Sequence, residues 1–229
     1  HPENKLRASV LADPAFTRRN TKDNTPCVLH VDLVPGSRVS VDVAAKGGGS
    51  ENKSKFKMMN PSDNIVDWVV EMLPQMGAGW CPPGMLGIGI GGTAEHCVLL
   101  AKQALMEPID MGPLKARGPK NDIEAMRIEI FDKVNALGIG AQGLGGLSTI
   151  LDVKIMDAPC HAAGKPVAMI PNCAATRHAH FTLDGAGPAY LEAPKLDEWP
   201  EVDWKPDAAA IRVDLDRLTP EIVAGWKQG

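Results

Sequence analysis

The chain has 229 residues and a formal net charge of −4. This acidic balance argues against a partner with a strongly negative surface, such as a nucleic acid or an anionic membrane. No apolar stretch reaches the ~20 residues of a membrane span, and no signal peptide opens the chain. The length allows one large domain or two small ones with a real core.

The first predicted element is a β-hairpin over residues 27–46. Apolar residues alternate with other residues on both sides of Pro35-Gly36-Ser37, which supplies the turn.

Three helices follow, because apolar residues recur at helical spacing. They are predicted near residues 63–73, 93–106 and 121–137. Ser62 is the predicted cap of the first helix, and Asn121 with Glu124 resembles a capping box for the third. Residues 106–119 carry three prolines and two glycines, so this stretch is predicted to be a loop.

Short apolar segments predict strands, which lie near residues 86–90, 149–155 and 167–170. Together these elements predict an α+β fold, with a small, mainly antiparallel sheet that includes the hairpin and is surrounded by helices. The main domain is expected over residues 1–181, an extended linker over 182–210 and the start of a second domain over 211–229. We expect the chain to be a piece of a longer protein.

The number and spacing of the cysteines indicate which cellular compartment and which kinds of cysteine site are compatible with the chain. The cysteines at 27, 81, 97, 160 and 173 are odd in number and widely spaced, which suits neither a disulfide framework nor a zinc finger. A reducing cytoplasm fits best. Cys27 and Cys97 are interpreted as small buried apolar residues.

Cys81 is the most informative position. It lies in Gly79-Trp80-Cys81-Pro82-Pro83-Gly84, where the proline rings restrict the backbone. The glycines of residues 87–92 follow and permit close backbone approach to whatever the sulfur binds. Cys173 is the second candidate thiol.

Glycine clusters at residues 47–49, 87–92 and 138–146 could cradle a phosphate. The Gly-x-Gly-x-x-Gly run that starts at Gly138 follows a helix and not a strand, and the run after Lys46 lacks the P-loop spacing. Nucleotide binding is therefore disfavoured, and close approach to an anion or a metal cluster remains.

Three histidines are candidates of lower specificity. His161, between two predicted strands, is either a polar surface residue or an acid/base or carboxylate-binding group. His178 and His180 follow Cys173 at a spacing that is a weak metal-ligand pattern.

In combination, these motifs resemble the class I, iron–sulfur-dependent fumarases and their relatives, which include the α subunit of L(+)-tartrate dehydratase. The resemblance is carried, in order along the chain, by the run from Lys46 to Lys53, Cys81-Pro82-Pro83 with Gly91-Gly92-Thr93, the run from Leu137 to Gly143, and His161 followed by Cys173.

The resemblance implies a 4Fe–4S cluster bound by Cys81, Cys173 and a third cysteine outside this chain. It implies substrate contacts for Arg7, Gly49 and His161, and it places the catalytic base and acid outside the chain. Cys81, Cys173, Gly49 and His161 are expected to converge on one cavity.

The implied reaction is the reversible hydration of fumarate to (S)-malate, a step of the tricarboxylic acid cycle, with a homodimer as the full-length form. Tartrate or another hydroxy-diacid is the alternative substrate. A non-catalytic metal-binding or structural module is the alternative of another class. The isolated chain is predicted to be inactive and unable to hold an intact cluster, since one ligand is missing.

Overall fold

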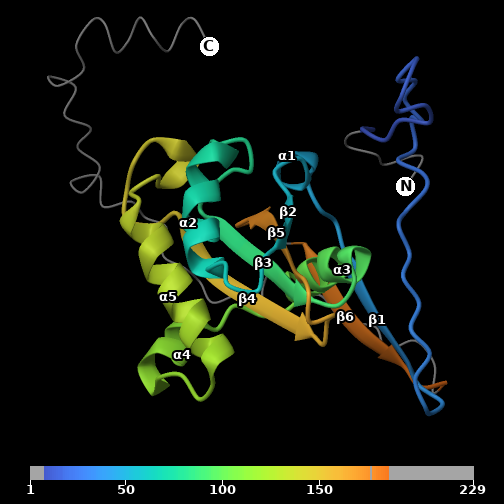
Figure 1. The fold of residues 1–229 in the computed structure, drawn as a ribbon. Coiled ribbons are helices and arrows are strands. Elements are labelled where there is room, and N and C mark those ends of the chain that lie inside the picture. The colour runs from blue at the N-terminus through green and yellow to red at the C-terminus, as the bar shows by residue number, and fades with distance from the viewer. Residues whose placement is uncertain (1–7, 176, 186–229) are drawn as a thin grey trace, which may run out of the picture. The chain divides into compact units, whose positions relative to one another are not determined.

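The computed structural model describes residues 8–175 and 177–185, which belong to the first of two units, His1–Ala186 and Gly187–Gly229. Its elements, in chain order, are β1 (Val39–Ala44), α1 (Gly48–Glu51), β2 (Lys55–Met59), α2 (Ile65–Met76), β3 (Gly84–Gly91), α3 (Ala94–Ala104), α4 (Met111–Arg117), α5 (Asp122–Ala136), a 3-10 turn (Ala141–Gly143), β4 (Ile150–Ala158), β5 (Lys165–Cys173) and β6 (His178–Leu183) (Figure 1).

The main sheet has four strands in the order β2-β5-β3-β4. The β2–β5 and β5–β3 pairs are antiparallel, whereas β3 and β4 are parallel. A parallel pair needs a long crossover, and α3, α4 and α5 occupy the chain between these two strands. A second, two-stranded antiparallel sheet pairs β1 with β6. The predicted α+β class is confirmed.

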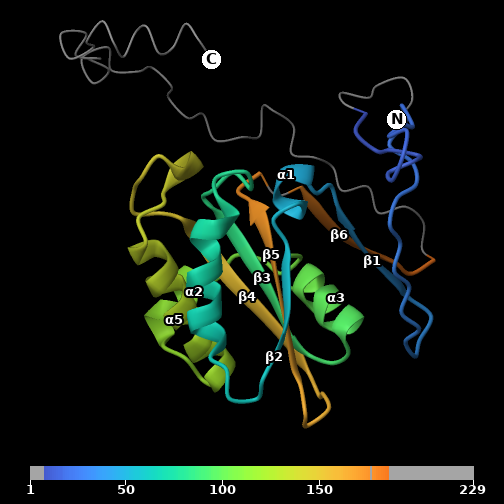
Figure 2. The same cartoon turned by 45° about the horizontal axis from the view of Figure 1, so that its top comes forward.

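Helices cover both faces of the main sheet: α2 and α5 lie on one side and α3 on the other (Figures 1 and 2). Alternate residues of β3 serve the two faces, as the pleat of a strand requires. Leu86 and Ile88 pack into the core formed with α2 and α5, while Met85 belongs to the cluster under α3.

The glycines of β3 were predicted to let the backbone approach a ligand, but in the structure they serve the packing of a helix. A Cβ on Gly87 would lie 2.2 Å from the Ala101 carbonyl oxygen, and one on Gly89 would lie 2.0 Å from that of Cys97. These contacts are with the backbone of α3, so the glycines let that helix approach the sheet closely.

The predictions for three helices are confirmed by α2, α3 and α5. The Asn121 side chain accepts a hydrogen bond from the Glu124 N–H at the start of α5. At the start of α2 the capping side chain is Asn64, which accepts from the Asp67 N–H, so the prediction of Ser62 was wrong.

The prediction of a loop over residues 106–119 was also wrong, because α4 forms within it. Pro113 lies in the first turn of α4, where a missing backbone N–H removes no bond within the helix. Proline content alone therefore did not exclude a helix.

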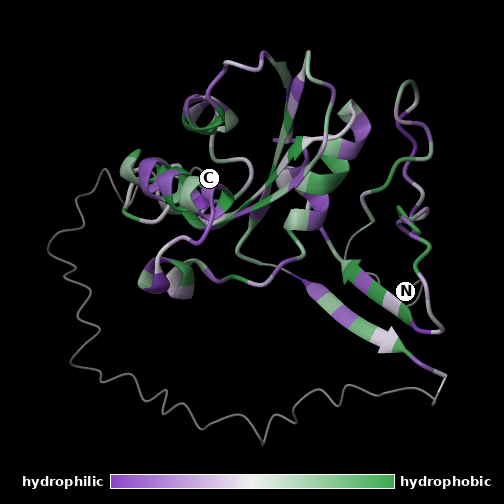
Figure 3. Cartoon of the chain, turned by 60° about the horizontal axis from the view of Figure 1, so that its bottom comes forward, coloured by the Kyte–Doolittle hydropathy of each residue, from purple (hydrophilic) through white to green (hydrophobic). Residues whose placement is uncertain are grey.

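The predicted hairpin over residues 27–46 does not form. Its second half is β1, but β1 pairs with β6, in a register that sets Val39 opposite Leu183. Its first half pairs with no strand of the part of the chain that the structure describes, and its apolar side chains are exposed, including Leu29 and Val31. The β1–β6 ribbon alternates hydrophobic and hydrophilic residues (Figure 3).

The remaining predictions concern the linker, the second domain, Arg7 and the absence of a membrane span. Thr182 and Leu183, expected to open the linker, close β6. The linker from residue 186 on, the predicted start of a second domain and the candidate Arg7 lie outside the described residues. Among the described residues, no helix has the length and apolar character needed to cross a membrane.

Candidate iron–sulfur site

Cys81 lies in the tight loop between α2 and β3. Its backbone has φ of 59°, in the left-handed region that non-glycine residues rarely adopt, and its N–H donates to the Ala78 carbonyl over 2.9 Å. The next carbonyl, that of Pro82, accepts from the Gln142 N–H over 2.7 Å, which ties the loop to the third glycine cluster. The residue is exposed, with a free thiol. The loop therefore presents a sulfur at the surface.

Cys173 is the last residue of β5 and is brought to the same end of the sheet. It lies opposite Gly84, the first residue of β3 and three positions after Cys81. The Ala174 N–H then donates to the Pro83 carbonyl over 3.2 Å. Antiparallel register thus joins two segments that are far apart in the sequence.

Gly49 also lies at this end of the sheet. A Cβ at Gly49 would be 2.6 Å from the Gly79 carbonyl oxygen, so a side chain there would force α1 away from the Cys81 loop. On its other side, the Ala45 N–H donates to the Arg177 carbonyl over 3.0 Å, beyond Cys173. The segment from Ala45 to Gly49 therefore connects the two cysteine-bearing segments.

Charged groups line this segment. Lys46 Nζ donates to Ser50 Oγ over 3.1 Å and pairs with Glu51 Oε2 at 3.1 Å, while Lys102 Nζ reaches the same carboxylate at 2.5 Å. Burial lowers the pKa of Lys46, and Glu51 and Cys173 act in the opposite direction. The pKa of Glu51 is also lowered: burial alone would raise it, and the contacts with Lys102 and Lys46 outweigh that effect.

His161 is not part of this arrangement. It lies in the exposed turn between β4 and β5, where its Nδ1 accepts from the Ala163 N–H over 3.1 Å. Lys165 and Cys173 are the two ends of β5, and eight steps of about 3.3 Å separate them by roughly 26 Å. The expectation that His161 shares a cavity with the two cysteines was wrong for this domain, and its contact with substrate stays a prediction.

The remaining cysteines differ in environment. Cys97 is buried in α3, as predicted, and its sulfur donates to the Gly89 carbonyl over 3.2 Å. Burial raises the pKa of its thiol to about 11. Cys27 was expected to be buried at the start of a strand, but it is exposed in a segment without strand pairing.

His178 and His180 both lie in β6, where residues two apart share a face. They line a pocket of about 260 Å³ together with Met85, Glu107 and Ile109, among others. His180 pairs with Asp42 across the two-stranded sheet. The pocket stands apart from the thiols of Cys81 and Cys173, which do not line it.

The donor set at the end of the sheet fits part of an iron–sulfur site. Cys81 and Cys173 offer two free thiols on hydrogen-bonded backbone, with the cationic Lys46 on the Cys173 side. Within residues 8–175 and 177–185, no three or more His, Cys, Asp or Glu side chains form a group that could hold a metal ion. The two thiols therefore fit a cluster that takes its remaining protein ligand from elsewhere.

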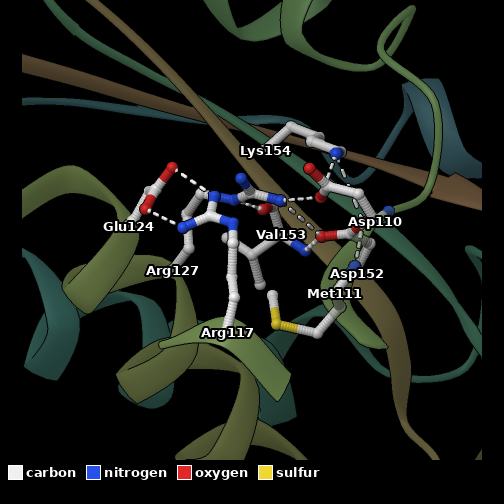
Figure 4. A network of polar contacts seen from close by, with 8 residues as sticks. All are labelled: Asp110, Met111, Arg117, Glu124, Arg127, Asp152, Val153 and Lys154. Atoms are coloured by element: carbon white, nitrogen blue, oxygen red, sulfur yellow. Dashed lines mark hydrogen bonds and ion pairs between the residues drawn. The ribbon is translucent and has the colours of Figure 1, made fainter. Parts of the chain in front are cut away.

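Sequence reasoning missed a buried polar network on the β4 side of the sheet (Figure 4). Asp152, fully buried, accepts from the N–H groups of Asp110 and Met111 over 2.7 and 3.2 Å and pairs with Arg127 at 3.1 Å. Lys154 pairs with Asp110 at 2.5 Å. The signal was present in the sequence, since an acidic and a basic residue interrupt the apolar strand near residues 149–155.

Comparison with known proteins identifies the family. A sequence model of the family described as Fumarate hydratase (Fumerase) matches residues 1–182. A protein of Methanocaldococcus jannaschii named "Putative L(+)-tartrate dehydratase subunit alpha" is 40% identical over 172 residues, which are 72% of this chain and 59% of that protein. L(+)-tartrate dehydratase subunit alpha of Escherichia coli UTI89 is 30% identical over 187 residues, which are 77% of this chain and 60% of that protein.

This chain thus spans about 60% of the length of these curated relatives. The family match covers most of the described residues, including Cys81, Gly49, His161 and Cys173. The chain belongs to the class I fumarate hydratase (Fumerase) family.

Proposed function

We propose that this chain is the cluster-carrying part of a hydro-lyase that interconverts fumarate and (S)-malate. The observation that carries the proposal is the convergence of Cys81 and Cys173 through the register of β3 with β5 and the hydrogen bond from Ala174 to Pro83. Family membership supplies the reaction class. The third cysteine ligand, the base and the acid are proposed to lie outside this chain.

A 4Fe–4S cluster held by three thiolates leaves one iron free of protein ligands, and that iron is a Lewis acid for a substrate hydroxyl and carboxylate. The residues of this chain hold and frame that centre. Cys81 and Cys173 ligate it, and the close contact of Gly49 with Gly79 keeps backbone rather than a side chain beside it.

Substrate contacts complete the proposal. Arg7 is proposed to bind a substrate carboxylate, because a guanidinium can hold two carboxylate oxygens at once. Gly49 is proposed to contact substrate through its backbone, and its place beside the Cys81 loop supports this. His161 would have to meet the substrate from another part of the assembled protein, since it lies at the far end of the sheet.

A second substrate is favoured by a specific observation. The relatives reported above carry the name of L(+)-tartrate dehydratase subunit alpha. Tartrate is a hydroxy-diacid like malate, so the same Lewis-acid and carboxylate-binding groups would serve it. Fumarate hydration remains the first proposal, with tartrate dehydration as its alternative.

The partners and compartment are proposed with the function. The full-length protein is proposed to be a homodimer that acts on a small dicarboxylate, without nucleic acid or membrane as a partner. All five thiols of this chain are free in the structure, and free thiols persist in reducing compartments. This supports the cytoplasm as the proposed location.

The experiment uses the full-length protein, purified without oxygen and reconstituted with iron and sulfide. Fumarate absorbance is followed on addition of malate, with tartrate in parallel. Turnover of malate that is lost in air supports the iron–sulfur fumarase, whereas preference for tartrate supports the alternative. A bound cluster without turnover of either substrate contradicts the proposal. The isolated chain is expected to show no turnover, which is the matched control for the missing groups.

His161→Ala separates the substrate role from the cluster. The variant is expected to keep the iron content of the unaltered protein and to turn over more slowly. His161 lies in the turn before Lys165, and β5 spans roughly 26 Å from Lys165 to Cys173. Iron and sulfide analysis beside the activity assay checks both parts. A fall in cluster content would show that His161 supports the cluster rather than the substrate.

A further inference from the structure

Lys46 is a nearly buried cation at the cysteine site. Only 12% of its side chain is exposed, and its ammonium contacts Ser50 Oγ and Glu51 Oε2, each at 3.1 Å. Ser50 is itself buried, with 2% exposure, and its hydroxyl donates to the Gly47 carbonyl over 3.1 Å. A lysine is almost never buried unless it is paired. These contacts fix the ammonium group in one place.

The backbone sets Lys46 beside Cys173. The β1–β6 ladder sets Ala44 opposite His178, and the next residue, Ala45, bonds to the Arg177 carbonyl. Lys46 is therefore the next residue after the paired part of β1, on the side where the partner strand leads back to Cys173. A charge on Cys173 acts on Lys46 and raises the pKa of its ammonium, against the larger effect of burial.

The charges around Lys46 do not cancel. Glu51 is shared between Lys46 and Lys102, at 3.1 and 2.5 Å. Two ammonium groups and one carboxylate leave one net positive charge. The Lys102 side chain is about one third exposed, so water can solvate its charge. The Lys46 side chain is far less exposed to water. An incompletely compensated buried charge is costly, so the arrangement favours an anion beside Lys46.

We propose that Lys46 is a positioning residue for the iron–sulfur cluster, whose negative thiolate-ligated form its ammonium stabilises on the Cys173 side. The inference rests on the proposed function, because the anion that Lys46 faces is the cluster of that function. Ser50 and Glu51 hold the ammonium in place, and the glycines that follow leave room for the cluster. Net charge near such a cluster also sets its reduction potential.

The test uses the full-length protein, reconstituted without oxygen, with Lys46→Met. Its release of iron to a chelator is expected to be at least about tenfold faster, the effect typical of removing an outer partner of a metal ligand. Its midpoint potential is expected to fall. The ammonium of Lys46 stabilises the more negative, reduced cluster, and the variant lacks this stabilisation. Lys46→Arg keeps the charge and is expected to restore the potential in large part.

Lys102→Met is the matched control, because it removes the same charge from the same carboxylate but on the exposed side. Its iron release is expected to stay within about twofold of the unaltered protein, well below the effect of removing an outer partner of a ligand. Circular dichroism of the cluster-free proteins checks that the variants fold, and Lys46→Gln, which can still donate to Ser50, replaces Lys46→Met if that variant does not.

Each outcome decides the matter. Unchanged iron release and potential in Lys46→Met, or equal changes in Lys102→Met, overturn the inference while the cluster and the proposed function stand. If the unaltered protein takes up no cluster, the proposed function and the inference fail together.

Discussion

Two polar regions of the domain, the network around Asp152 and the cysteine end of the sheet, differ in how fully their groups are paired. Both oxygens of Asp152 accept hydrogen bonds, and Arg127 and Lys154 each contact two carboxylates. At the cysteine end, the buried amide Nδ2 of Asn172 has no hydrogen-bond partner within residues 8–175 and 177–185.

The cysteine end has two further signs of an incomplete site. The thiols of Cys81 and Cys173 are free, and the Cys81 backbone is in the left-handed region. Buried polar groups are nearly always paired in folded proteins, and unpaired or strained ones gather where a ligand completes them. The difference fits a role in folding for the Asp152 network and agrees with the proposal that the cysteine end binds a ligand.

The largest expected effect on folding comes from the paired region. Asp152→Ala leaves Arg127 and Lys154 with one carboxylate fewer in a buried setting, and this typically costs about 3–5 kcal/mol of stability. Urea unfolding of the cluster-free protein measures it. Asp132→Ala, which removes an exposed pair with Lys115 at 2.5 Å, is the control and is expected to cost no more than about 1 kcal/mol. Equal costs would contradict the assigned role of the network.

A smaller loss of stability is expected from changes at the β3 glycines, which were first predicted to face a ligand. In Gly89→Ala the new Cβ would lie 2.0 Å from the Cys97 carbonyl oxygen, so α3 must shift, at a cost of about 1–3 kcal/mol. Gly112→Ala is the control, because no atom lies within 4 Å of its added Cβ. That change is expected to be neutral or stabilising by up to ~1 kcal/mol in the same urea unfolding measurement. A neutral Gly89→Ala would mean that the close packing of α3 is not required.

The pH dependence of the network is expected to be weaker still. Burial acts to raise the pKa of Asp110, but Lys154 and Arg127 outweigh it and hold the pKa below its ordinary value of 3.8. A depressed pKa contributes stability that is present above that value and lost as the pH falls through the folded-state pKa. Urea midpoints between pH 6 and about pH 3 should fall less in Asp110→Asn than in the unaltered protein. Parallel pH profiles would contradict this, and partial solvent exposure of Asp110 keeps the effect small.

The smallest effect on folding, with the largest effect on binding, is expected for Cys81→Ser. Cys81 is exposed, so the cluster-free protein should keep its stability within about 1 kcal/mol. Iron bound by the reconstituted full-length protein should fall to background, since one of its thiolate ligands is gone. Cys160→Ser, also exposed but in the turn at the other end of the sheet, is the control and should retain iron. Full iron content in Cys81→Ser would remove Cys81 from the site.

Local patterns predicted much of the fold. Apolar periodicity located α2, α3 and α5, and the Asn121 capping signal was correct to the residue, because these features depend on neighbours within a few positions. Strand pairing does not. Val39 pairs with Leu183, and no turn signal near Pro35 could reveal a partner so far along the chain.

The candidate site was predictable only in part, for the same reason. Cys81, Cys173 and Gly49 were found from motifs, and long-range register then brought them together. His161 was expected beside them because the family resemblance implies a substrate contact for it, but β5 carries the chain along the sheet between His161 and Cys173. Lys46 was noted as the first residue of a motif and was given no role of its own, because its contacts with Ser50 and Glu51 appear only once α1 is folded.

The most direct test of the central claim is a thiol cross-linking measurement on the cluster-free full-length protein, using a short bifunctional reagent and peptide mapping. Cys81 and Cys173 are expected to be joined, whereas neither should be joined to Cys160 in the turn between β4 and β5. Failure to join Cys81 to Cys173, or a link from either of them to Cys160, would contradict the single site at the end of the sheet.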